Sequence, residues 1–154
     1  MNKKIDNLRK YRQALLNQIS SLTTEQLNRK PHGFSNNIIW NVAHLISAQQ
    51  VICYRRAGHP EVVLDKYISP FLTNTKPERI INENEIREIK YLFIDTLDTL
   101  QSDCGKKIFN AYTPSPNILK VYGIKITSIE EALEFLLYHE GYHGGCVLAL
   151  KHLV

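Results

Sequence analysis

The nine residues from Ile38 to Ile46 are apolar on almost every side of a helix, and this restricts the folds open to the chain. A helix that is hydrophobic all round must be covered on several sides by other parts of the protein. No segment of the 154 residues approaches the roughly 18 apolar residues of a membrane span, so other helices have to provide that cover. The sequence therefore predicts a central, buried helix surrounded by amphipathic ones.

Three further segments have apolar residues at alternating spacings of three and four, the signature of amphipathic helices. They run from about residue 4 to 22, from 82 or 84 to 105, and from 127 to about 152. The last begins with a capping box, Thr127-Ser128-Ile129-Glu130. The central helix begins after Ser35, Asn36 or Asn37 and ends near Ala57, where Gly58 is placed to terminate it.

Two long connections join these helices. Residues 59–81 have no sustained period and contain Pro60, Pro70 and Pro77, and connections of this length are often lids or binding loops. Residues 106–125 contain two short pieces with β-leaning composition, 108–109 and 119–126. Four long helices with long crossovers predict an all-α chain that forms one domain over residues 1–154, a four-helix bundle.

Composition and charge exclude several classes of function. The net charge of +4 comes from loosely spread basic residues rather than the dense stripe of a nucleic-acid binder, so we expect no nucleic-acid partner. Three cysteines without paired spacing favour a reducing compartment over a disulfide framework. With no apolar leader at the first residues and no membrane-length segment, the sequence predicts a cytoplasmic protein without a membrane partner.

The last helix carries two histidines, His139 and His143, four residues apart. Side chains at this spacing lie one above the other on the same helix face, so the two imidazoles can grip one transition metal. Both lie on the stripe that includes Leu136 and Leu150 and otherwise predicts core. Imidazoles in a buried seam need polar partners there, and a metal ion would be one.

The segment His139-Glu140-Gly141-Tyr142-His143 matches the H-E-x-x-H of zinc proteases, but the third ligand is missing. Only eleven residues follow His143, and Ala149 stands where the extended motif needs histidine. His44 is the only other histidine on a buried helix, whereas His32 and His59 fall in loops. Three histidines with an open position are the pattern of a catalytic metal site; a thiolate from Cys146 would instead close the site.

The stretch from Asn37 to Leu45, followed about 95 residues later by His139-x-x-x-His143-x-Gly145, resembles the DinB-like (DinB/YfiT) superfamily. The resemblance implies a four-helix bundle in up-down-down-up order that binds zinc or nickel through the matching residues His44, His139 and His143. It also implies a thiol S-transferase or isomerase activity with low-molecular-weight thiols such as bacillithiol or mycothiol, and a homodimer. Cys146 stands where the family often has glutamine.

Four neighbours of the expected ligands are candidates for a pocket or for orienting the histidines. Trp40 lies one turn before His44 and either walls the pocket or packs in the core; Asn41 and Glu140 can orient ligands or act as acid or base. A solvated position is the favoured prediction for Glu140, because it lies about 100° around the helix from His139. Tyr142, like Tyr138, is expected to pack, with lining of the site as the alternative.

The functional hypothesis is a divalent-metal enzyme that acts on a small molecule. Zinc or nickel held by three imidazoles would lower the pKa of a bound thiol or water to about 7. The alternatives are a non-catalytic metal-binding stress protein, a metal-dependent hydrolase, and a DNA-associated protein. The last is suggested by the pI near 8.9 and by the association of the resembled family with DNA damage. The adjacent Gly144-Gly145 pair predicts close approach of a neighbouring helix or a substrate.

Overall fold

The computed structural model describes residues 1–154 as an all-helical chain without strands, which confirms the predicted class. The four long α-helices are α1 (Asn2–Gln18), α3 (Ile38–Gln49), α4 (Glu83–Gly105) and α6 (Ile129–Lys151). The two shorter ones are α2 (Thr24–Asn28) and α5 (Pro116–Tyr122). Single turns are η1 (Gln50–Tyr54) and η2 (Arg55–Ala57), which prolong α3, and η3 (Asp65–Tyr67) and η4 (Ser69–Phe71) in the first crossover. No helix combines the length and apolar character that crossing a membrane requires.

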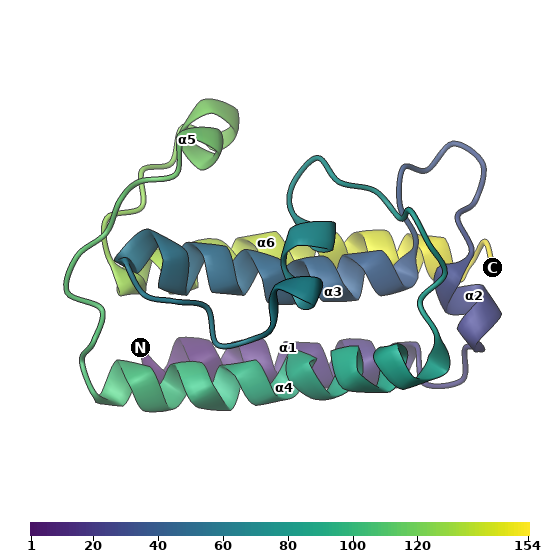
Figure 1. Ribbon diagram of the computed structural model, residues 1–154, viewed down its shortest axis with the longest axis horizontal. Coiled ribbons are helices and arrows are strands. Elements are labelled where there is room, and N and C mark those ends of the chain that lie inside the picture. Colours follow the sequence, from purple (N-terminus) through teal and green to yellow (C-terminus); the bar gives the residue numbers. More distant parts are fainter.

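The four long helices form two side-by-side pairs, α1 with α4 and α3 with α6 (Figure 1). Contacts between α1 and α6 and between α3 and α4 join the pairs, so that every long helix packs against two others. In Figure 1, α1 and α6 run toward the same end of the molecule, and α3 and α4 run toward the opposite end. Nearly every residue of α3 is buried, as its all-round apolar sequence predicts.

Local sequence signals explain most of the helix ends. The Asn37 side chain caps α3 by accepting a hydrogen bond from the Trp40 backbone N–H at 2.9 Å. Asn82 and Glu85 form a reciprocal capping box at α4. Gly58 ends the extended α3 with a φ of 76°, a left-handed conformation that glycine adopts without strain.

Three sequence predictions about the helices were wrong. The predicted capping box Thr127-Ser128-Ile129-Glu130 does not form, because Ser128 is the N-cap of α6 and accepts a hydrogen bond from the Glu131 N–H. The first helix ends at Gln18 rather than at residue 22, because Thr23 is the N-cap of a separate helix, α2, and forms a capping box there. The β-leaning stretch 119–126 is in part helix α5. Its start and stop signals, Pro116 at the first turn and Gly123 in a left-handed conformation just after the end, outweigh the β-branched residues between them.

A buried arginine links all four long helices at the centre of the bundle. Arg12 of α1 is fully buried, and its Nη2 and Nε donate to Glu140 Oε1 of α6 at 2.6 and 2.9 Å. Arg12 Nη1 donates to the Phe93 carbonyl of α4 at 2.7 Å, and Nη2 reaches the Leu45 carbonyl of α3 at 3.5 Å. Burial raises the pKa of the Glu140 carboxyl, and the neighbouring Arg12 guanidinium opposes that rise.

The predicted solvated position of Glu140 is therefore wrong. The prediction was based only on the angle around the helix between Glu140 and His139. Glu140 also continues the three-and-four spacing of buried residues that includes Leu136 and His143. Arg12 likewise belongs to the buried stripe of α1, together with Leu8 and Leu15. Two opposite charges on facing apolar stripes indicate a buried ion pair rather than a solvated face.

Candidate metal centre

Three histidines from two neighbouring helices come together in the bundle. His44 lies on α3, and His139 and His143 lie on α6. All three residues are buried, with exposed fractions of 4%, 9% and 8%. One ring nitrogen of each lies within 4.8 Å of the others, and the Nε2 atoms of His44 and His139 are 3.4 Å apart. In a tetrahedral zinc site with Zn–N bonds of about 2.0–2.1 Å, two ligand nitrogens lie about 3.3–3.4 Å apart. The residues therefore fit a metal ion.

Hydrogen bonds on the outer nitrogens of two imidazoles set which nitrogen faces the shared centre. His44 Nδ1 donates to the Phe71 carbonyl at 2.6 Å, and His143 Nδ1 donates to Asn41 Oδ1 at 2.9 Å. Asn41 is itself held, since its Nδ2 donates to the Asn37 carbonyl at 2.8 Å. With Nδ1 protonated, each Nε2 keeps its lone pair for a ligand, the arrangement usual for metal-binding histidines.

His139 has no such partner. Its Nδ1 is buried without a hydrogen bond, and its ring stacks on Phe135 with centroids 5.7 Å apart. Its Nε2 points at the Nε2 of His44, which carries a lone pair. Two nitrogens so placed need a proton or a cation between them, because unpaired buried polar atoms are costly. This geometry supports a cation shared by the three rings.

The lowered pKa values of the three histidines keep their imidazoles uncharged near neutral pH. Burial and the neighbouring imidazoles lower the pKa of His139 to about 3, and burial and His44 lower the pKa of His143 to about 3. Burial also lowers the pKa of His44, against the opposing effect of its bond to Phe71. All three rings are thus neutral at pH 7, the form that binds a metal.

The remaining candidates have distinct places around the cluster. Trp40 is buried, and its indole stacks on His44 with centroids 4.8 Å apart and planes inclined by 8°. Asn41 orients His143, as described above. Tyr142 is 62% exposed and meets His143 only edge-on, and Cys146 is not part of the cluster. Glu140 is turned away toward Arg12.

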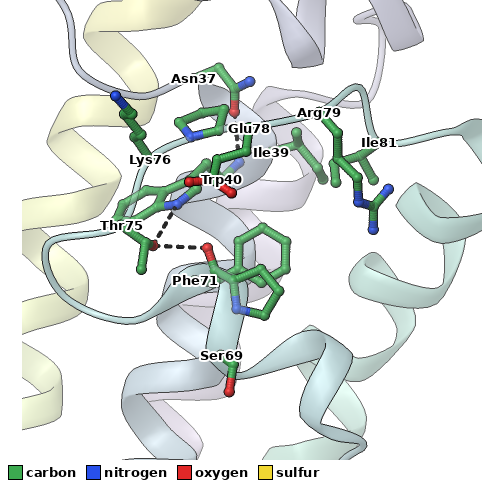
Figure 2. Close-up of a pocket in the computed structure, with 12 residues that line it drawn as sticks. Asn37, Ile39, Trp40, Ser69, Phe71, Thr75, Lys76, Glu78, Arg79 and Ile81 are labelled. Carbon is green, nitrogen blue, oxygen red and sulfur yellow. Dashed lines mark hydrogen bonds between the residues drawn. The ribbon is translucent and has the colours of Figure 1, made fainter.

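A cavity of about 410 Å³ opens onto the three histidines. It is bounded by α3, α6, the loop at 72–74 and α5, which lies above one end of the α3–α6 pair (Figure 1). A second cavity of about 470 Å³ is also lined by Trp40 but by none of the histidines (Figure 2). The three histidine side chains all line the first cavity, so we assign the candidate site to it.

The first crossover holds one side of the site in place. Besides the Phe71 carbonyl, it provides Thr75, whose Oγ1 accepts from Trp40 Nε1 at 3.2 Å and donates to the Pro70 carbonyl at 2.8 Å (Figure 2). These bonds fix the indole against His44. The sequence indicated a functional role for residues 59–81, but it could not show that the contact to His44 would be a backbone carbonyl.

Two other contributors to the site were missed. Phe135 stacks on the ring of His139, and α5 lines one side of the cavity. Phe135 lies one turn before His139 on the same face, a spacing that would have indicated it. The caps of α5, Ser115 before Pro116 and Gly123 at the end, would have indicated the helix but not its position.

Fold and site together define an all-helical protein with a candidate metal centre of three histidines from two helices. The chain belongs to the DinB superfamily, whose family model matches residues 7–147. This confirms the resemblance carried by the segment around His44 and by the histidine pair of the last helix. No curated protein matches the chain in sequence.

Proposed function

We propose that this protein is a divalent-metal-dependent enzyme that activates a low-molecular-weight thiol for S-transfer, within a bundle of up-down-down-up order. The ligands are His44, His139 and His143. The observation that carries the proposal is the convergence of three neutral imidazoles, two with Nδ1 bonded away, on one centre that opens into a cavity. A bound divalent ion would act as a Lewis acid and favour the thiolate form of a thiol at neutral pH.

The chain's own residues supply the positioning. Phe71 and Asn41 hold two imidazoles in the tautomer that leaves Nε2 free, and Trp40 and Phe135 pack against the rings and exclude water. The cavity of about 410 Å³ is within the usual range for small-molecule sites, about 300–1,000 Å³. The substrate and the electrophile would meet there, next to the histidines.

An open coordination sphere favours an enzyme over a structural metal site. A structural zinc site usually has four protein ligands, whereas this cluster has three and Cys146 is outside it. Imidazole ligands suit both zinc and nickel, so the residue types allow either ion. A metal-dependent hydrolase would use the same site with water as the nucleophile, and a non-catalytic metal-binding protein would share the metal affinity without turnover.

The test is an activity screen on the purified protein loaded with zinc or nickel. Small thiols are paired with electrophiles such as monobromobimane, and thioether formation is followed by fluorescence. We expect turnover that His44→Ala abolishes and that His152→Ala, an exposed histidine at the end of α6, leaves unchanged. Metal binding without turnover over a broad range of thiols and electrophiles would refute the transferase proposal in favour of a non-catalytic protein. Ester or amide hydrolysis dependent on His44 would favour the hydrolase.

A further inference from the structure

The cavity above the histidines is positively charged at one end. Its lining contains no Asp, Glu or Lys, but it contains two arginines, Arg55 and Arg56, from the turn that follows α3. Arg55 is neutralised by an ion pair with Glu61. Arg56 takes part in no ion pair, and its Nε is buried without a hydrogen-bond partner. The charge of Arg56 is therefore uncompensated in a cavity that contains no carboxylate, and such a guanidinium favours an anionic ligand.

The two ends of the cavity lie along one helix. The π-turn η1 separates α3 from the arginines, and such insertions in a helix often occur at functional sites. Arg56 follows His44 by twelve residues, about 18 Å along a helix axis. Arg56 and the three histidines line the same cavity, so one ligand in it can contact both. A ligand that touches both ends must therefore be an extended molecule.

We propose that Arg56 forms the anion-binding subsite of this cavity, and that the substrate is an extended thiol whose far end carries a carboxylate or phosphate group. The thiol end lies at the histidines, and the anionic end accepts hydrogen bonds from the guanidinium. Planar guanidinium groups bind carboxylates and phosphates through two parallel hydrogen bonds. Ser115 and Asn117, which also line the cavity, offer further polar groups to the ligand. The thiol part of this inference rests on the proposed function; the anion site rests on the cavity alone.

The first experiment tests the anion site in the purified full-length protein. Thermal unfolding is measured against rising succinate or inorganic phosphate at constant ionic strength, with chloride as the reference salt. We expect saturable stabilisation in the wild type and in Arg87→Gln, which removes an exposed arginine of α4 outside the cavity. Arg56→Gln should lose it, and Arg56→Lys should keep part of it. Comparison of succinate with phosphate identifies the preferred anion.

The anion site is refuted if the wild type shows no stabilisation beyond that of chloride, or if Arg56→Gln retains it in full. Arg56→Gln is compared with the wild type in the absence of added anion, so that a general loss of stability is measured separately from the loss of the anion effect.

The second experiment tests whether the two ends act on one ligand. Mercaptohexanoate and mercaptohexanol, which differ only at the far end, are titrated into cobalt-loaded protein, and the thiolate-to-cobalt absorption band is followed. We expect the acid to bind about tenfold or more tightly than the alcohol, as one charge-assisted hydrogen-bonded pair provides. The advantage should vanish in Arg56→Gln and persist in Arg87→Gln.

The two proposals fail in different ways. Equal binding of acid and alcohol in the wild type overturns the assignment of Arg56 and leaves thiol activation intact. A thiol that never produces the absorption band contradicts the proposed function, and the anion titration then still decides whether Arg56 binds an anion.

Discussion

The buried ion pair between Arg12 and Glu140 allows a quantitative test of how the bundle is held together. Both side chains are fully buried. Replacing Arg12 by Met leaves the Glu140 carboxyl without its partner, and breaking a buried pair in this way costs about 3–5 kcal/mol of unfolding free energy. For a chain of this size each kcal/mol lowers the melting temperature by about 2–4 °C, so the expected loss is about 6–20 °C.

The double variant Arg12→Met, Glu140→Leu should recover most of that loss. Replacing both charges removes the uncompensated carboxyl, and exchange of a whole buried pair for apolar residues is often neutral or stabilising. The Phe93 and Leu45 carbonyls that Arg12 contacts are in helices and retain helical hydrogen bonds, so the double variant leaves few buried polar atoms unsatisfied.

Urea unfolding followed by far-UV circular dichroism measures these free energies, with the same metal loading for every variant. Arg9→Met is the matched control: Arg9 lies on the same helix and pairs with Asp98 at the surface, where such pairs contribute about 0.2–1 kcal/mol. A cost below about 1 kcal/mol for Arg12→Met, or a double variant as unstable as the sum of the two single ones, would refute the reasoning.

Three further predictions concern the residues around the histidines. Asn41→Ala removes the acceptor that orients His143 and should weaken metal affinity about 10–100-fold in competition with a chromophoric chelator; unchanged affinity would exclude an orienting role. Gly144→Ala places a Cβ 1.5 Å from the Tyr11 hydroxyl oxygen and should destabilise the protein by about 1–3 kcal/mol, whereas Gly145→Ala, with open space around it, should stabilise it by about 0.5–1 kcal/mol; urea unfolding that ranks the two the other way contradicts the packing. Cys146→Ser should leave the bound metal per chain unchanged in elemental analysis, because Cys146 is outside the cluster, and a loss of metal would show that its thiolate is a ligand.

Features that depend on local sequence were largely predictable. The all-round apolar character of α3 and the caps at Asn82 and Gly58 follow from side-chain periodicity and backbone preference. The residues of the candidate site could also be predicted from the sequence. His139 and His143 share a face by helix geometry alone, and His44 is the only other histidine in an apolar helix. The structure brings the three together.

Features that depend on tertiary contacts could not be predicted from the sequence. The Phe71 carbonyl that orients His44 is a backbone group, and no residue type marks it in the sequence. The burial of Arg12 and Glu140 required both helices to be considered together, because each charge alone predicts a solvated position. The glycine pair was predictable only in part. The small size of both residues predicted a close approach, and the structure identifies Tyr11 as the neighbour of Gly144, whereas a Cβ at Gly145 would meet nothing within 4 Å.

The central claim, that three imidazoles share one divalent ion, is tested most directly by X-ray absorption spectroscopy at the metal edge of the purified protein. The account predicts about one zinc or nickel ion per chain, with three imidazole nitrogens at about 2.0–2.1 Å in the case of zinc, and loss of that signal when His44, His139 and His143 are replaced by Ala. A protein that takes up no metal, or a bound ion whose spectrum lacks imidazole scattering, would contradict it.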